Sequence, residues 1–267
     1  MIQSVRRAAA ILRELGAGQP RLGVTELAER LGLAKATVHG LLRALEEDEL
    51  VERDVETGKY RLGPALLQLG NAFLDGHELR ARSLLWADAL ASRTHEAVRV
   101  GVPNGTTVLV VHHVFRPDNS VQILEVGAAI PWHACALGKA CAAHAANGGL
   151  EELLDGERAR LTGRTVVDAG DLRRALDRIR HDGVAIEDQE AVIGEAEIAA
   201  PVFGHDAHAV GAIGVVGPVE RLLPGGEPDE EVLAAVKEAA RGLSRDLAGV
   251  RRYVRATSGL PLGSVGP

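Results

Sequence analysis

The stretch VTELAERLGLAKATVHGLLRAL, residues 24–45, predicts two short helices separated by a tight turn. Thr25 is a good N-cap for the first helix, and Gly32 is placed to end it. The second helix should run from about Ala34 to Glu47. Two such helices are typical of a helix-turn-helix, in which the second helix enters the major groove of DNA.

The second helix has one polar and one apolar face. Lys35, His39 and Arg43 follow each other every four residues, so they form a single stripe. The separate stripe that would pack on the preceding helices consists of Val38, Leu41, Leu42 and Leu45. On an isolated helix such charges are usually only solvated, but the preceding helix and glycine turn favour a surface that reads DNA.

The flanking segments complete a winged helix-turn-helix. Ser4 is expected to cap an additional helix at the N-terminus, which ends at Gly16. Residues 50–63 show two short alternating runs around a polar turn, as in a β-hairpin. Seven basic and three acidic side chains give residues 1–45 a charge of +4, although the whole chain carries −7. This local charge matters because it decides whether a surface attracts phosphates.

We expect the DNA contacts to come from the second helix and the hairpin. Lys35 and Arg43 can reach phosphates or guanine, and His39 could read a base edge. Thr37 and Gly40 suit a close approach to the DNA. The complete set of expected DNA-binding residues is Thr25, Lys35, Ala36, Thr37, His39, Gly40, Arg43, Arg53, Lys59 and Arg61.

The remainder of the chain alternates helical and strand-like runs. Residues 64–94 are helical in pattern with a break near Asp75–Gly76, and Asn104–Gly105 is a strong hairpin signal between two strands. Further strands are expected at 121–127, 183–192, 195–203 and 208–217, and helices at 134–146, 171–181 and 229–250. This order favours an α+β fold with a mainly antiparallel sheet over a Rossmann repeat. The Gly/Pro-rich end, from about residue 256, is predicted to be disordered.

Bulk composition excludes several classes of protein. The first residues show no secretory signal, and no apolar run approaches the roughly 20 residues that span a bilayer, so we expect no membrane partner. Two cysteines supply no disulfide framework, which favours a cytoplasmic location. Aromatic residues make up only 3% of the chain, which argues against a stacking platform for single-stranded nucleic acid.

The stretch HACALGKACAAH, residues 133–144, holds both cysteines and two histidines. Cys135 beside His133 could be a thiol nucleophile, but no third, orienting group is evident. As a zinc site the pattern lacks the usual CxxC pair, and Cys135 and Cys141 would lie on different faces of a helix. We favour a third interpretation, in which these small residues pack a buried helix.

Several motifs, in order, resemble those of the IclR family of transcriptional regulators. They include QSVRRAAAILREL (3–15), GKYRLGPALLQLG (58–70), PWHACALGKACAAH (131–144), GVAIEDQEAVIGEAEIAAPVF (183–203) and GAIGVVGPVERL (211–222), so the resemblance covers about residues 1–250. Segments 78–91 and 108–128 are similar to the glycerol operon regulators of that family. The resemblance implies a winged helix-turn-helix at 1–63, a linker helix at 64–76 and a GAF-like effector domain at 77–250. Residues 251–267 would form the disordered tail.

The resemblance also implies partners. A homodimer or a dimer of dimers would bind a palindromic, double-stranded DNA operator, and a small metabolite would control that binding. Glycerol or glycerol 3-phosphate is the first candidate for this effector. The residues that correspond to the family's effector pocket are Cys135, Ala136, Leu137, Gly138, Glu187, Glu195, Glu197, Gly214 and Val216. Backbone amides at the start of the helix at 134–146 could hold an anionic oxygen of the effector.

The chain departs from the family at Glu197, where many relatives carry Cys or Ser. Glu195 and Glu197 would share one face of a strand, and with Glu187 they would crowd three carboxylates together. Such a group needs a proton, a cation or a cationic ligand, which makes an acidic effector doubtful and leaves room for a neutral polyol or a metal-assisted ligand. Alternatively, Glu195 and Glu197 face solvent at a sheet edge. If the effector is a phosphate, positive charge could come from Arg116, Lys139, His112 and His113.

The sequence therefore predicts a DNA-binding repressor and not an enzyme, with no cofactor and no bound metal expected. Two alternatives stay open at this point. The chain could regulate another catabolic operon, for a small carboxylate or an aromatic compound. It could instead be a thiol enzyme or redox sensor that uses Cys135 and His133.

Overall fold

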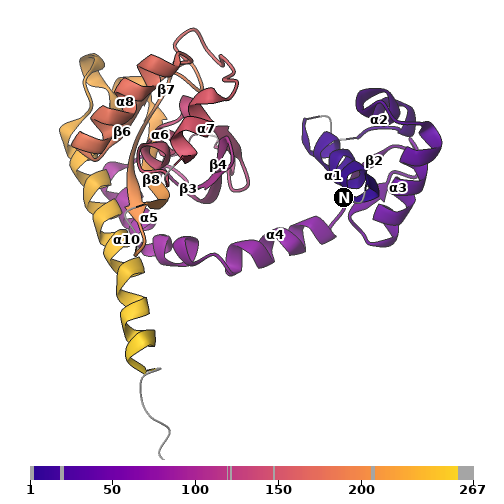
Figure 1. Cartoon of the computed structure of the whole chain (residues 1–267), viewed down its shortest axis with the longest axis horizontal. Coiled ribbons are helices and arrows are strands. Elements are labelled where there is room, and N and C mark those ends of the chain that lie inside the picture. The colour runs from indigo at the N-terminus through magenta and orange to yellow at the C-terminus, as the bar shows by residue number, and fades with distance from the viewer. Residues whose placement is uncertain are drawn as a thin grey trace, which may run out of the picture. The chain divides into compact units, whose positions relative to one another are not determined.

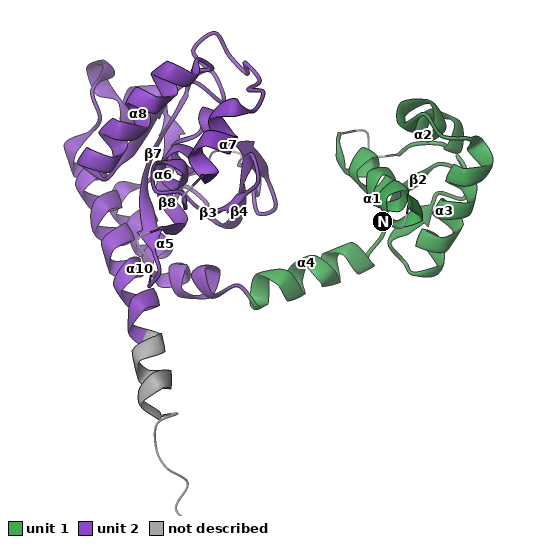
Figure 2. Cartoon of the chain, viewed as in Figure 1, with its two compact units in different colours: residues 1–76 green, residues 77–267 purple. Residues whose placement is uncertain are grey.

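The computed structural model describes residues 3–18, 21–118, 120, 122–146, 148–205 and 208–257. The chain forms two compact units, residues 1–76 and residues 77–267 (Figure 2). Each unit has a core of its own. Among the described residues, no helix is both long and apolar enough to cross a membrane.

The first unit combines helices with a short hairpin, as expected for a winged helix-turn-helix (Figure 1). Its elements are α1 Gln3–Gly16, α2 Val24–Leu31, α3 Lys35–Glu47, β1 Val51–Arg53, β2 Tyr60–Leu62 and α4 Ala65–Asp75. β1 and β2 pair antiparallel, and Leu22 forms a bridge to Tyr60 that ties the loop before α2 to the hairpin. The core of this unit includes Ile11, Leu27, Leu42 and Tyr60.

Two predicted helix starts are wrong. Gly23, not Thr25, is the N-cap of α2, because the Glu26 carboxylate reaches back to accept the Gly23 N–H at 2.6 Å. Thr25 therefore lies inside the helix, with its side chain exposed. Ser4 also lies within α1, which already includes Gln3. In contrast, Gly32 ends α2 in the left-handed conformation, as expected.

The second unit is built on one antiparallel sheet. Its strands are β3 Ala97–Asn104, β4 Thr107–Val114, β5 Ala129–Pro131, β6 Ala185–Asp188, β7 Glu195–Phe203 and β8 Ala209–Pro218, in the spatial order β5-β4-β3-β8-β7-β6. Gly105, at φ 58°, turns the chain between β3 and β4, as the Asn104–Gly105 signal predicts. The α+β prediction with a mainly antiparallel sheet is confirmed.

Helices cover both faces of this sheet. They are α5 Glu78–Thr94, α6 Ala136–Ala143 after a 3₁₀ turn at Trp132–Ala134, α7 Gly149–Asp155, α8 Ala169–Asp182, α9 Val219–Leu222 and α10 Glu230–Thr257. Ala212 of β8 packs in the core that contains Leu137 of α6. Its neighbour Gly211 faces Leu79 of α5 instead, because successive residues of a strand point to opposite faces. Helix α10 packs along α5, where the Trp86 indole donates to Asp246 at 2.7 Å.

Three features of the second unit differ from the sequence expectations. Residues 122–127 form no strand, and β5 follows at Ala129–Pro131. The reason is local, because the Gln122 side chain accepts from Arg116 N and donates to Arg116 O, which replaces a strand ladder with a closed loop. Helices α7 and α9 were not expected. Helix α10 continues to Thr257, into the segment predicted as a disordered tail, and residues 258–267 lie outside the described part of the chain.

Candidate functional site

The exposed face of α3 carries the predicted polar stripe. Lys35, His39 and Arg43 are exposed, whereas Val38, Leu42 and Leu45 are buried against the rest of the unit. Arg43 is oriented by Glu47, with its Nε 3.3 Å from the carboxylate. A methyl group added at Gly40 would meet nothing within 4 Å. This glycine is therefore not required by packing inside the chain.

The hairpin carries less free positive charge than the sequence suggests. Lys59 pairs with Glu26 at 3.2 Å, and Arg61 pairs with Glu52 at 2.7 Å. Arg53 is exposed, with its guanidinium 6.0 Å from the centre of the Tyr60 ring. Of the three cations predicted on the hairpin, only Arg53 has no ion pair among the described residues. It is thus the one best placed to meet a phosphate.

A chamber of about 470 Å³ opens at the ends of the central strands of the large sheet, on the face that carries α6. Its wall includes Arg99 of β3, Glu195 of β7, Val216 of β8 and His113 of β4. Arg116 and Glu125 enter from the loop that follows β4, whose Ile123 is 81% exposed. The chamber thus brings Glu195 and Val216, both predicted effector residues, together with charged groups from distant parts of the chain.

Arg99 is the centre of a buried ion network at the base of this chamber. The residue is 9% exposed, and its guanidinium contacts both carboxylate oxygens of Glu125, through Nη2 at 2.6 Å and through Nε. Its Nη1 lies 3.5 Å from Glu197 Oε1. Burial opposes the charged form, but Glu197 and Glu125 together raise the pKa of Arg99. The guanidinium therefore stays charged between two carboxylates.

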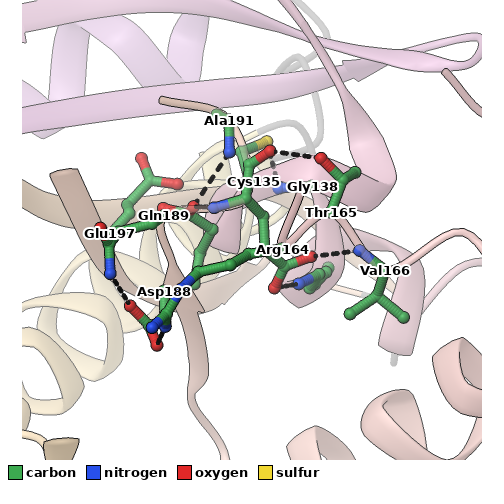
Figure 3. Close-up of polar contacts among 12 residues, drawn as sticks. Cys135, Gly138, Arg164, Thr165, Val166, Asp188, Gln189, Ala191 and Glu197 are labelled. Atoms are coloured by element: carbon green, nitrogen blue, oxygen red, sulfur yellow. Dashed lines mark hydrogen bonds and ion pairs between the residues drawn. The ribbon is translucent and has the colours of Figure 1, made fainter. Parts of the chain in front are cut away.

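The first amides of α6 are already used by the chain itself. Leu137 N donates to Glu197 Oε2 at 3.2 Å. Gly138 N donates to Cys135 Sγ at 3.3 Å (Figure 3). Gly138 permits this turn, because a methyl group there would lie 2.2 Å from the carbonyl oxygen of Trp132. The amides predicted to hold an effector oxygen are thus occupied by a buried carboxylate and a thiol.

Two of the three carboxylates predicted to crowd together do so, and two of the expected remedies are present. Glu187 and Glu197 are cross-strand neighbours and both are buried, whereas Glu195 is exposed at the chamber. Burial, followed by the nearby Glu197, raises the pKa of Glu187 to about 8. This raised pKa favours the protonated form of Glu187 near neutral pH, and Glu197 has Arg99 as its cation. Burial raises the pKa of Glu197 too, and Arg99 and the Leu137 amide oppose that rise.

A second buried pair joins α6 to the segment that follows β6. Lys139 forms an ion pair with Glu190, and both are nearly inaccessible. Glu190 also accepts from Val166 N at 3.1 Å, and its carbonyl accepts from Thr165 Oγ1 at 2.7 Å (Figure 3). Lys139 is therefore committed to holding the 162–166 loop. It is not among the residues that line the chamber.

The cysteine and histidine cluster has the character of packing residues. Both thiols are buried, and burial raises the pKa of Cys141 to about 12 and that of Cys135 well above its usual value. His133 directs its Nε2 to the carbonyl of Ala159 at 2.9 Å. Within the described ranges, no three His, Cys, Asp or Glu residues are grouped as a metal site.

The remaining predicted effector residues lie in the core. Ala136 and Leu137 are fully buried, and Gly214 allows close strand contact, since a methyl group there would lie 2.6 Å from Ala199 Cβ. These residues shape the floor below the chamber and do not line it. His112 points to the other sheet face, toward Asp88 of α5.

Sequence reasoning missed Arg99 and Glu125, which organise the chamber. A usable signal existed for Arg99, because it stands alone in the apolar run AVRVGV at 97–102. A charge in the middle of a buried strand requires a partner. Glu125 gave no comparable signal, since it lies in an irregular loop.

The chain matches two family models, described as "IclR helix-turn-helix domain" over residues 4–55 and "Bacterial transcriptional regulator IclR C-terminal" over residues 71–245. It is 50% identical to the glycerol operon regulatory protein of Streptomyces griseus, covering 94% of this chain and 98% of that protein. It is 47% identical to the protein of the same name from Streptomyces coelicolor, with the same coverage. A crystal structure of an IclR transcriptional regulator from Alicyclobacillus acidocaldarius aligns with a TM-score of 0.79 at 25% identity, covering 92% of this chain and 98% of that one.

Proposed function

The chain belongs to the IclR family of bacterial transcriptional regulators, and we propose that it represses a glycerol operon under the control of a small polyol or its phosphate ester. It is a DNA-binding transcriptional regulator, as are the relatives it matches. The glycerol assignment is supported by the names of two relatives that share about half of its residues along nearly the whole chain. Its site of action would be the cytoplasm, where the operator is.

We place DNA recognition on α3. The supporting observation is the exposed stripe of Lys35, His39 and Arg43 above a fully packed opposite face. These side chains could reach phosphates and base edges in the major groove, and Arg53 could reach an adjacent phosphate. A dimer would present two such helices to the two halves of a palindromic operator.

Replacing Gly40 with alanine should stabilise the first unit but weaken operator binding. Glycine inside a helix costs about 0.5–1 kcal/mol relative to alanine, and nothing in the chain obstructs the added methyl group. On the DNA side the methyl group would hold α3 away from the groove, and we expect operator affinity to fall about 5- to 100-fold. Thermal unfolding and a gel-shift titration measure the two effects.

Gly249→Ala is the matched control, because it also adds a methyl group in open space on a helix, but within α10. It should leave operator affinity unchanged. Wild-type operator affinity for Gly40→Ala would contradict our placement of α3 against DNA.

The chamber beside Arg99 is our candidate effector site, and His113 supplies the observation that carries it. Its Nδ1 accepts the Glu125 N–H at 3.3 Å, and burial lowers its pKa, so the neutral ring carries its proton on Nε2. Among the described residues that buried Nε2 has no hydrogen-bond partner, although it lies 3.8 Å from Glu125 Oε2. A hydroxyl group could accept from Nε2 and donate to a carboxylate, which matches the chemistry of a polyol.

A thermal-shift series tests this assignment. Glycerol, glycerol 3-phosphate and small carboxylates would each be added to the purified full chain, and active compounds would then be tested for their effect on operator binding. We expect glycerol or glycerol 3-phosphate to raise the melting temperature and to change operator affinity, since a ligand stabilises the state it binds. A response to a small carboxylate or an aromatic acid alone would instead favour another catabolic operon.

We also propose that the chain acts as a dimer or a dimer of dimers. Helix α4 supports this, because it is rich in leucine yet has no buried residue among its positions. Leu67 is 68% exposed and Leu69 is 61% exposed. A second copy of the chain would cover such a surface.

A further inference from the structure

The Glu197 carboxylate lies against the start of α6, where backbone amides could otherwise hold an anionic oxygen. Its side chain is 1% exposed on β7, and its two oxygens face two different donors. One accepts the Leu137 N–H at the start of α6, and the other lies 3.5 Å from the Arg99 guanidinium. An amide at a helix N-terminus and a guanidinium are the two kinds of group that proteins use to hold a carboxylate.

No further donor remains at this turn for an incoming anion. Gly138 N is taken by Cys135 Sγ, and Lys139 N donates to the Cys135 carbonyl within the helix. The Nε and Nη2 groups of Arg99 donate to the two carboxylate oxygens of Glu125. An effector carboxylate would therefore have to displace a buried side chain and leave its charge unpaired, which is costly.

We propose that Glu197 is a built-in carboxylate that closes this position to small carboxylate effectors and so determines which class of ligand the site accepts. The chain supplies the anion itself, and the ligand is left with the outer chamber, which His113, Arg116 and Glu195 line. This inference rests on the proposed effector role of that chamber. It adds that the selectivity against carboxylates resides in one residue.

The charge balance supports the assignment. Arg99 supplies one positive charge for the two carboxylates of Glu197 and Glu125, and the raised pKa of Glu187 across the strand favours its neutral form near neutral pH. A second anion entering this group would lack a counter-charge. Once Glu197 is removed, one anion can enter, and acetate has the same carboxylate head as the side chain it would replace.

The test is chemical rescue of Glu197→Ala by acetate, followed as thermal unfolding of the full chain. The variant should melt below wild type. Sodium acetate should then raise its melting temperature by about 3–6 °C more than sodium chloride of equal ionic strength, at ten times the acetate dissociation constant. Wild type should show no difference between the two salts. Glu197→Gln should also show none, because its amide still fills the position.

Glu238→Ala is the control, because it removes a carboxylate from an exposed pair with Arg93. It should not respond to acetate. If Glu197→Ala does not fold, Glu197→Ser opens the same space with a polar side chain, and acetate should stabilise it likewise.

Two results would overturn the proposal. One is equal acetate stabilisation of wild type and Glu197→Ala, which would mean that the position is already open. The other is the absence of any acetate effect on both Glu197→Ala and Glu197→Ser. Failure of the proposed function is separate, since it would appear as a wild type that responds to neither glycerol nor glycerol 3-phosphate while acetate still rescues the variants.

Discussion

Replacing Arg99 with methionine should lower the free energy of unfolding of the second unit by about 3–5 kcal/mol, because one partner of a buried ion pair is removed while the other stays buried. Here two carboxylates lose their cation. Glu197 is fully buried and the Glu125 side chain is 28% exposed. Among the described residues, Arg99 is the only Lys or Arg paired with either carboxylate, and the His113 ring near Glu125 has a pKa lowered by burial. Methionine keeps most of the aliphatic volume, so the loss reports charge and hydrogen bonding more than packing. Denaturant titration at neutral pH measures it.

Three comparisons make this prediction specific. Adding Glu197→Gln to Arg99→Met should recover about 1–2 kcal/mol, since it removes one stranded charge. Lowering the pH should also reduce the loss of unfolding free energy in Arg99→Met. The Glu197 carboxylate then binds a proton, and this proton neutralises the charge that the guanidinium balances in the wild type. Arg93→Met, which breaks the exposed pair with Glu238, should cost less than about 1 kcal/mol. An Arg99→Met cost no larger than that of Arg93→Met would mean that the network does not stabilise the unit.

The parts of the fold that could be predicted are those in which local pattern and burial agree. The four-residue spacing of Lys35, His39 and Arg43 predicted the exposed face of α3, because a helix converts that spacing directly into a stripe. The run at 195–203 predicted β7 with its correct limits. In the same way, Asn104–Gly105 identified the β3–β4 turn.

The parts that could not be predicted depend on partners distant in the sequence. The Arg99–Glu197 contact joins residues 98 positions apart, and it exists only because β8 pairs with both β3 and β7. The raised pKa of Glu187 likewise depends in part on the register that places it opposite Glu197. At residues 122–127 a side chain, not a strand, satisfies the backbone of Arg116, and alternation of apolar residues does not reveal that. The exposure of α4 could not be predicted from the sequence either, since leucines on a helix can face either the chain's own core or a second copy.

Helix α4 is therefore the place to test assembly, and changing both Leu67 and Leu69 to glutamate should weaken operator binding by about 100-fold or more. Two linked DNA-reading units bind far more tightly than one, because the second contact becomes intramolecular, and this gain is typically 10²–10⁴-fold. Leu67 and Leu69 lie on opposite sides of α4, so the double change places a glutamate on whichever side meets a second copy and removes the apolar contact there. Each copy keeps its fold, since these side chains are exposed and the core of the first unit lies elsewhere. Gel-shift titration measures the affinity, and sedimentation measures the mass.

Gln68→Glu with Asn71→Glu adds the same charge to α4 at polar positions and should leave both values near wild type. An operator affinity and mass that are unchanged in the leucine variant would place the dimer contact on another surface.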